Sequence, residues 1–343
     1  MKCVYDNRQL AHAPSRFLVS GAWQPCPEMP DRAEIFSKTV DALAYPVIAP
    51  PDSGRAAIEA VHSTRYFDFL EAIHPRWRRM EDASEEAIPN VHPVSRAGEA
   101  PGGYPKSAVG QVGYHVYDGS APIGAKTFDS AYWSAQTAIH ATDLVLGGED
   151  RVYALCRPPG HHASRELAGG FCFFNNSAIA AQKLRSVHGR VAVLDVDVHH
   201  GNGTQQIFYS RSDVLTVSIH AHPERFYPFF WGYADETGSG EGKGYNLNLP
   251  MQRGSGDADF HETLAAALMR IRQFQPGALV VALGLDAHES DPFKGMALTT
   301  AAFHEISKRI SALNLPTVIV QEGGYANPAL GENLQSFLTG AAG

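Results

Sequence analysis

The sequence predicts an α/β protein whose central, mostly parallel β-sheet is flanked by helices on both faces. Helical and strand-like segments alternate from about residue 127 onwards, a pattern typical of parallel sheets built from βα units. Residues 278–285 form a continuous apolar run, as expected for a strand that is buried on both faces. Residues 257–274 carry apolar side chains at helical spacing, which predicts a helix that packs against such a sheet.

The remaining elements follow in chain order. The front of the chain, residues 1–125, is irregular, with one expected helix at 56–73 and a proline- and glycine-rich stretch at 85–124 that we expect to be a loop. Behind it, the pattern predicts strands and helices at 129–146 (helix), 152–156 (strand), 175–187 (helix), 191–198 (strand), 214–220 (strand), 257–274 (helix), 278–285 (strand), 303–313 (helix) and 317–320 (strand). Since no linker interrupts the back half, we expect a single domain over residues 1–343, with 85–124 as a long loop insertion.

Composition excludes several classes of protein. The formal net charge is −8, which argues against a nucleic-acid binder, because such proteins neutralise phosphates with Lys and Arg. We expect no membrane span, because no apolar run approaches the roughly 18–20 residues that a span needs. The four cysteines lack metal-type spacing and are too few for a disulfide scaffold. With no secretory signal at the start, these observations predict a cytoplasmic protein.

Polar residues follow each predicted strand. In a parallel sheet, ligands bind beyond the carboxyl ends of the strands, so these residues should meet at one edge. They are Arg157 to His162, Asp195 to Gly203, His220, Asp286, and Gln321 to Tyr325. Five such coincidences favour an active site over a scatter of structural polar residues. A phosphate loop at Gly201–Gly203 is disfavoured, because the Lys-Ser/Thr of a P-loop is missing.

The densest group of polar residues is Asp195-x-Asp197-x-His199. Side chains at a spacing of two residues project to one side of a strand, so two carboxylates and an imidazole should converge. They would repel one another without a cation between them, although buried hydrogen-bonding residues are the simpler alternative. Asp and His donors suit Zn²⁺, and Asp286 is the candidate third ligand from another strand end. Ligand type also leaves Fe²⁺ and Co²⁺ open.

Two His-His pairs accompany this group, at 161–162 and 199–200. A neutral imidazole beside a metal-bound water is the usual general base, and Asp195 and Asn202 are suited to orient imidazole N–H groups. Gly170 leaves room for close approach, and Phe171 can form an apolar wall. The Gly-Gly turn before Tyr325 presents a phenol that can donate to an oxyanion.

The motifs together resemble the arginase-deacetylase fold of the zinc-dependent deacetylase family, which includes histone deacetylases and bacterial acetylpolyamine amidohydrolases. The stretches that carry the resemblance are RPPGHHA (157–163), GGFCFFNN (169–176), DVDVHHGNGT (195–204), VSIH (217–220), GLDAHESDP (284–292) and EGGY (322–325). They occur in family order over most of the chain. The front resembles the acetylpolyamine branch, through GQVGY at 110–114, and in that branch the long loop helps to form a dimer that narrows the site entrance.

The resemblance implies a role for each candidate residue. Zinc would be held by Asp197, His199 and Asp286. His162 would be the general base and then the general acid, oriented by Asn202, where many histone deacetylases have Asp. The remaining assignments are His161 backed by Asp195 as electrostatic partner of the base, Tyr325 as donor to the substrate carbonyl, and Gly170, Phe171 and Tyr227 as tunnel lining.

The resemblance also implies bound potassium. A first K⁺ would sit on Asp195 and on the backbone carbonyl oxygens of Asp197, His199, Ser218 and Ile219. A second K⁺ would involve the four residues Phe208, Arg211, Val214 and Tyr245.

The expected reaction is zinc-dependent hydrolysis of the acetamide bond in N-acetylated polyamines or diamines, such as acetylputrescine, acetylcadaverine and acetylspermidine. The expected partners are therefore a small cationic substrate and a second copy of the chain in a homodimer. Asp118 is the available carboxylate for the distal ammonium of the substrate. The alternatives are a broad acyl-lysine deacetylase, a dimanganese ureohydrolase of the same fold, and a non-catalytic binding module. The last two are disfavoured by a single ligand set and by the presence of proton-transfer groups.

Overall fold

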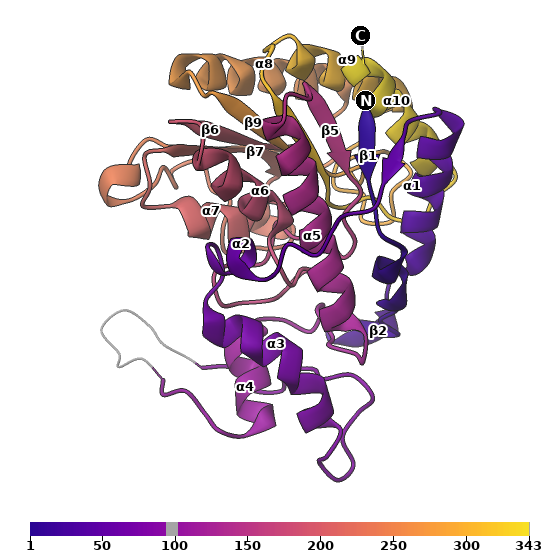
Figure 1. Ribbon diagram of the computed structural model, residues 1–343, viewed down its shortest axis with the longest axis vertical. Coiled ribbons are helices and arrows are strands. Elements are labelled where there is room, and N and C mark those ends of the chain that lie inside the picture. The colour runs from indigo at the N-terminus through magenta and orange to yellow at the C-terminus, as the bar shows by residue number, and fades with distance from the viewer. Residues whose placement is uncertain (94–101, 343) are drawn as a thin grey trace.

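An eight-stranded parallel β-sheet forms the centre of the computed structural model, which describes residues 1–93 and 102–342 (Figure 1). All seven strand pairings in this sheet are parallel, so the predicted sheet type is confirmed. From one edge to the other, the strands are β4 (Val47–Ile48), β1 (Lys2–Val4), β5 (Arg151–Ala154), β10 (Thr317–Gln321), β9 (Ala278–Leu283), β6 (Val191–Asp195), β7 (Val214–Ala221) and β8 (Asn246–Met251).

Helices cover both faces of the sheet, because the strands are apolar on both sides. Along β6, Ala192 and Leu194 pack into one core cluster, whereas Val191 and Val193 pack into the other. The first cluster contains α1 (Pro30–Ala42), α8 (Asp257–Phe274), α9 (Thr300–Ser311) and α10 (Leu330–Ala342). The second contains α2 (Ala56–Glu59), α3 (Thr64–Trp77), α4 (Ala108–His115), α5 (Thr127–Leu146) and α6 (Asn176–Arg185). The layered arrangement is visible in Figure 1.

The front of the chain is more regular than its sequence suggests. The helix expected at 56–73 is two helices, α2 and α3, and α3 begins after Ser63, whose side chain accepts from the Tyr66 N–H. The stretch expected to be a loop, 85–124, contains α4 among its described residues, whereas residues 94–101 lie outside them. Figure 1 shows α3 and α4 side by side, extending the molecule beyond the end of the sheet. A hairpin of β2 (Arg16–Val19) and β3 (Ala22–Pro25) lies at the same end.

The strand order places a switch point between β6 and β9. From β6 the chain adds β7 and then β8 on one side, and it returns with β9 and then β10 on the other side. At such a point the loops after two neighbouring strands leave in opposite directions and open a crevice for a ligand. The loops that follow β6 and β9 carry the predicted metal ligands. Within the described residues, no helix is long and apolar enough to cross a membrane.

Candidate active site

Asp197, His199 and Asp286 meet at the switch point. One ligand atom from each lies within 4.8 Å of the others, and all three side chains are buried. The imidazole Nδ1 of His199 lies 3.1 Å from Asp197 Oδ1 and 3.1 Å from Asp286 Oδ2. The structure therefore brings together the three residues that the sequence suggested as metal ligands.

The local reason for this convergence differs from the predicted one. Strand β6 ends at Asp195, so Asp197 and His199 lie in the loop beyond it and not on the strand. Side chains shape that loop: Asp195 Oδ1 accepts from the Asp197 N–H at 3.0 Å, and Asp197 Oδ1 accepts from the His199 N–H at 2.9 Å. Hydrogen bonds from backbone N–H groups therefore orient these carboxylates. The alternation of side chains along a strand does not orient them, because the strand has already ended.

The donor set fits a divalent cation. Burial and the neighbouring Asp197 raise the pKa of Asp286 to about 6, which reflects two carboxylates forced together. Burial lowers the pKa of His199, but hydrogen bonds to both carboxylates outweigh it and raise that pKa to about 9. The chain also keeps this space open, because a Cβ at Gly323 would lie 2.2 Å from Asp286 Oδ2. Two carboxylates and one imidazole are ligands that a catalytic zinc site uses.

The His161–His162 pair lies directly beside this group. His161 Nδ1 is 2.9 Å from Asp195 Oδ2, and His162 Nδ1 is 2.7 Å from Asn202 Oδ1 at the start of α7 (Asn202–Phe208). The His161 Nε2 atom lies 3.8 Å from Asp197 Oδ1. The structure thus supports the predicted pairing of each histidine with its own orienting side chain.

The two histidines differ in charge preference. Burial lowers the pKa of His161, but the carboxylates of Asp195 and Asp197 outweigh it and hold that pKa well above its ordinary value. Burial, together with the imidazoles of His161 and His199, holds the pKa of His162 well below its ordinary value. These shifts favour the charged form of His161 and the neutral form of His162, and a neutral imidazole is the form that can accept a proton.

Sequence reasoning missed Glu322 as a support of this pair. Its buried carboxylate accepts from the N–H groups of Gly160 and His161, at 2.6 and 3.0 Å, and from the Ser177 hydroxyl at 2.6 Å. Burial raises the pKa of Glu322 to about 7. Glu322 directly follows strand β10. Its position at a strand end was the signal in the sequence that could have marked it as part of the site.

Tyr325 follows on the same turn and is buried against Phe171 and Phe293. Its N–H donates to Asp291 Oδ2 at 3.1 Å, while the other oxygen of Asp291 accepts from the Phe293 N–H at 2.9 Å. The Tyr325 ring lies 4.8 Å from Phe293 and 5.8 Å from Phe171. Asp291 lies in the GLDAHESDP stretch and Phe293 comes two residues later, just after that stretch, but sequence spacing alone did not single them out.

Comparison with known proteins identifies the family of the chain. The histone deacetylase domain family matches residues 26–341. The chain belongs to this family. It is 48% identical over 341 residues to the acetylpolyamine amidohydrolase of Burkholderia pseudomallei, covering 99% of this chain and 98% of the relative. It is 42% identical over 345 residues to acetylpolyamine amidohydrolase 1 of Pseudomonas aeruginosa, covering 100% of this chain and 99% of the relative.

The fold agrees with the family. A crystal structure of acetylpolyamine aminohydrolase from Burkholderia pseudomallei superposes with a TM-score of 0.96 at 47% identity, covering 100% of this chain and 98% of that one. Membership in the histone deacetylase family makes the chain a hydrolase that acts on amides.

Aromatic side chains surround the histidines of this family member. The Tyr227 ring meets the His162 ring edge-on at 4.9 Å, and the Phe226 ring stacks on His199 at 4.9 Å. Gly170 has φ +54°, and a Cβ there would lie 2.5 Å from the His162 ring. Phe171 follows with φ +68° and is buried. The predicted lining residues therefore lie together, and Phe226 was missed because sequence gives no ring orientation.

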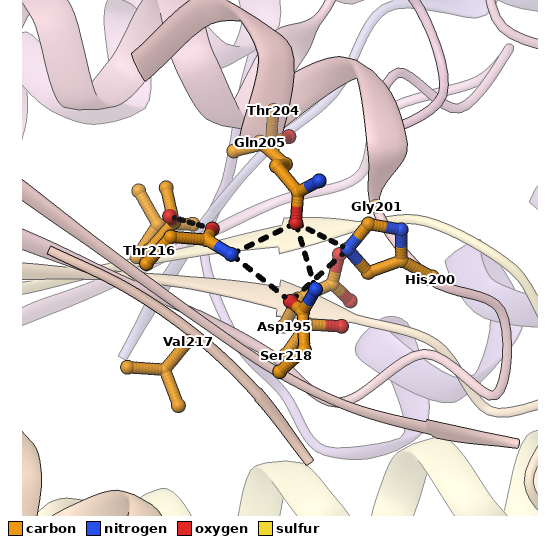
Figure 2. A pocket seen from close by; sticks show the side chains of 11 residues that line it. Asp195, His200, Gly201, Thr204, Gln205, Thr216, Val217 and Ser218 are labelled. Atoms are coloured by element: carbon orange, nitrogen blue, oxygen red, sulfur yellow. Dashed lines mark hydrogen bonds between the residues drawn. The ribbon is translucent and has the colours of Figure 1, made fainter. Parts of the chain in front are cut away.

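The residues suggested for the first potassium lie beneath the metal group. Asp195 on β6 pairs with Ser218 on β7, and Ile219 is the next residue of β7. Figure 2 shows that Asp195 and Ser218 line a polar pocket together with His200 and Gln205. Gln205 Oε1 lies 3.0 Å from His200 Nε2, so His200 faces this pocket and a buried polar network.

Three of the four residues suggested for the second potassium lie between the end of α7 and the start of β7, and Tyr245 directly precedes β8. Phe208 ends α7, its carbonyl accepts from the Arg211 N–H at 2.9 Å, and Val214 begins β7. The Tyr245 carbonyl accepts from the Thr216 N–H at 3.1 Å, which brings it beside β7. The Arg211 guanidinium is turned to Asp213, 2.8 Å away.

Asp118 lies in the segment between α4 and α5, and its carboxylate points back into the protein. It accepts from the Tyr227 hydroxyl at 2.7 Å, from the Gly170 N–H at 2.9 Å and from the Ser120 N–H at 2.9 Å. Burial raises its pKa above the ordinary value. A carboxylate has about four acceptor sites, so three are already used inside the chain.

Proposed function

We propose that the chain is a zinc-dependent hydrolase that cleaves the acetamide bond of N-acetylated polyamines and diamines and releases acetate and a free amine. One observation carries the proposal: the buried Asp197–His199–Asp286 group lies beside His161 and His162, and each of these imidazoles is hydrogen-bonded to its own orienting side chain. The substrate class is supported by full-length likeness to relatives named acetylpolyamine amidohydrolases. The examples that we propose are acetylputrescine, acetylcadaverine and acetylspermidine.

The metal ligands would be Asp197 Oδ, His199 Nδ1 and Asp286 Oδ. A bound Zn²⁺ polarises an amide carbonyl and acidifies a water, and Fe²⁺ or Co²⁺ supply the same chemistry at such ligands. The two carboxylates partly neutralise the cation, so the chain's own proton-transfer groups carry more of the rate. We further propose structural K⁺ at the two sets of residues described above.

Proton transfer would be performed by His162. Its Nδ1–H donates to Asn202 Oδ1 at 2.7 Å, which leaves Nε2 as the free acceptor for the proton of the attacking water. The same Nε2–H would then protonate the leaving amine as the C–N bond breaks. His161, held as an imidazolium by Asp195, stabilises the charge that develops nearby. Tyr325 would donate its hydroxyl hydrogen to the carbonyl oxygen as that atom gains charge.

The test is a panel of kcat/KM values on zinc-loaded protein with acetylputrescine, acetylcadaverine, acetylspermidine and an acetyl-lysine peptide. We expect the acetylated amines to be preferred by at least about tenfold. Preference for the peptide would instead support the acyl-lysine deacetylase alternative. The His162→Ala variant is the matched blank, because it retains all three metal ligands.

We also propose a cytoplasmic homodimer. The β2–β3 hairpin exposes Leu18, Val19 and Trp23, and the turn after Tyr227 exposes Phe229 and Phe230. Exposed apolar side chains of this size are commonly covered by a partner. Sedimentation velocity at several concentrations tests the dimer, and a constant monomer mass would refute it.

A further inference from the structure

A row of hydrogen-bonded side chains connects Asp118 with His162. Asp118 Oδ2 is 2.7 Å from the Tyr227 hydroxyl, which is 2.8 Å from the Tyr117 hydroxyl. The Tyr117 hydroxyl lies 3.4 Å from Asn202 Nδ2, the longest link in the row. Asn202 Oδ1 completes the row at 2.7 Å from His162 Nδ1. These residues come from four separate segments of the chain, so the row exists only in the folded protein.

The direction of every hydrogen bond in this row can be derived in sequence, starting from Asp118. Asp118 Oδ2 accepts from the Gly170 N–H, and the Tyr227 hydroxyl donates to the same oxygen. The Tyr227 oxygen is then free to accept from Tyr117, and the Tyr117 oxygen accepts from Asn202 Nδ2. The remaining Asn202 atom, Oδ1, must accept, so His162 carries its hydrogen on Nδ1.

All donors in the row therefore point towards the carboxylate. Hydrogen bonds that are aligned in one direction polarise one another, and they do so more strongly away from water. Asn202 is 1% exposed, and His162 is 4% exposed, so the inner end of the row is dry. The Tyr227 ring also contacts the His162 ring edge-on at 4.9 Å, so its hydroxyl and its ring act on the same imidazole.

We propose that Asp118 is a positioning residue for the general base: through Tyr227, Tyr117 and Asn202 it holds His162 in the tautomer and orientation that leave Nε2 free to accept a proton. The proposal rests on the proposed role of His162. It also replaces the expected role of Asp118 as a clamp for the distal ammonium, because three of the acceptor sites of this carboxylate are already used by Tyr227, Gly170 and Ser120.

Two matched substrates separate these roles. Acetylputrescine carries a distal ammonium, and N-butylacetamide has nearly the same length without the charge. A clamp acts on the first substrate only and appears as a rise in KM. A residue that positions the base through this row of hydrogen bonds, here called the relay, affects both substrates alike, and its loss appears as a fall in kcat.

Three variants test the relay. Asp118→Ala removes the terminal acceptor, and Tyr117→Phe cuts the row while leaving every hydrogen bond of Asp118 in place. We expect each to lower kcat about tenfold on both substrates, and the double variant to be no slower than the slower single variant, because both break the same row. Asp118→Asn keeps an acceptor oxygen for Tyr227, so we expect it to recover kcat to within about threefold of wild type.

Tyr66→Phe is the matched control. It also removes a buried hydroxyl, one that donates to the Phe173 carbonyl at 2.7 Å, but it lies outside the row. We expect it to lower the melting temperature without changing kcat. The relay is overturned if the Asp118→Ala and Tyr117→Phe effects multiply in the double variant, or if Asp118→Asn and Asp118→Ala raise KM for acetylputrescine alone. The single and double variants are compared on every acetamide that the wild type cleaves. A preference for acetyl-lysine peptides would therefore overturn the proposed substrate, but the comparison would still decide whether Asp118 positions His162.

Discussion

The guanidinium of Arg32 lies 4.8 Å from the centre of the Tyr325 ring. From α1 it donates to the carbonyl oxygens of Glu322 and Gly324, at 2.6 and 2.5 Å, and so fastens the turn that carries Tyr325. Arg32 itself is 1% exposed and forms an ion pair with Glu28 at 2.7 Å. A helix in the front of the chain thus holds a proposed catalytic residue in the back.

The Arg32→Lys variant should therefore lose activity without losing its fold. Lysine keeps the positive charge that Glu28 requires, but a single ammonium cannot reproduce the planar fork that reaches two carbonyls. We expect kcat for acetylputrescine to fall at least about tenfold with little change in KM, because Tyr325 is displaced and binding groups are not. Steady-state kinetics with a parallel zinc determination tests this. A changed KM at constant kcat would contradict the assignment.

Glu28 should be among the most costly carboxylates to remove. Its Oε1 lies 2.7 Å from Arg32 and 3.0 Å from Arg157, and all three side chains are buried. Glu28→Gln leaves two buried guanidinium groups without a carboxylate, so we expect a loss of about 3–5 kcal/mol in the free energy of unfolding by urea. Glu305→Gln is the control: its 2.6 Å pair with Arg309 lies at the surface, and we expect a much smaller loss. Equal losses would refute the argument.

The sequence predicted the centre of the molecule and the convergence of Asp197, His199 and Asp286, because both leave strong local signals. The strand at Ala278–Leu283 is apolar on both faces, and polar residues follow each central strand. Strand ends meet at one edge in any parallel sheet, so the topology brings the loops that carry Asp197, His199 and Asp286 together. The predicted strand-like alternation of Asp197 and His199 was wrong in its mechanism, because β6 ends at Asp195.

The missed features depend on contacts between distant segments. Strand β1 has three residues and no periodicity, and its place in the sheet is set by its pairing with β4 and β5. Glu28 and Arg32 have the spacing of an ordinary exposed helical ion pair, and only the fold buries them against Arg157. The position of Asp118 could be read from the sequence, but the direction of its side chain could not.

Buried neutral histidines should make stability fall on mild acidification. Burial lowers the pKa of His62 to about 4, whereas an unfolded histidine titrates near 6.5. Between these values the unfolded chain binds the additional proton, so the free energy of unfolding decreases as pH falls from about 6.5 to about 4, by about 3 kcal/mol for this residue. His62→Gln, which offers an oxygen to the Asn175 N–H, should flatten that slope by about one proton in urea titrations.

Metal content should depend on the three converging ligands. We expect about one equivalent of zinc per chain by elemental analysis, loss of activity on chelation and recovery on addition of zinc. Asp286→Ala should bind less than about a tenth of an equivalent, because it removes one of three ligands and leaves two. Asp129→Ala is the control, since this carboxylate pairs with Lys126 on the surface. Two equivalents of manganese per chain would instead support a dimanganese ureohydrolase.

Two glycines with nearly the same positive φ should respond differently to alanine. Gly170 has φ +54° and Gly240 has φ +53°, so both substitutions carry a similar strain of about 1 kcal/mol. A Cβ at Gly170 would lie 2.5 Å from His162 and 2.8 Å from the Tyr227 hydroxyl, whereas at Gly240 no heavy atom lies within 4 Å.

Gly170→Ala must therefore push the His162 ring away from its position. We expect kcat/KM for acetylputrescine to fall by about a hundredfold, the effect of displacing a catalytic group by about 1 Å. Gly240→Ala should lose only the stability that corresponds to the backbone strain, as measured in urea titrations, and should keep its activity. Full activity in both variants would contradict this prediction. It would mean that the close contact between the Gly170 backbone and the His162 ring is not needed to hold the ring in place for catalysis.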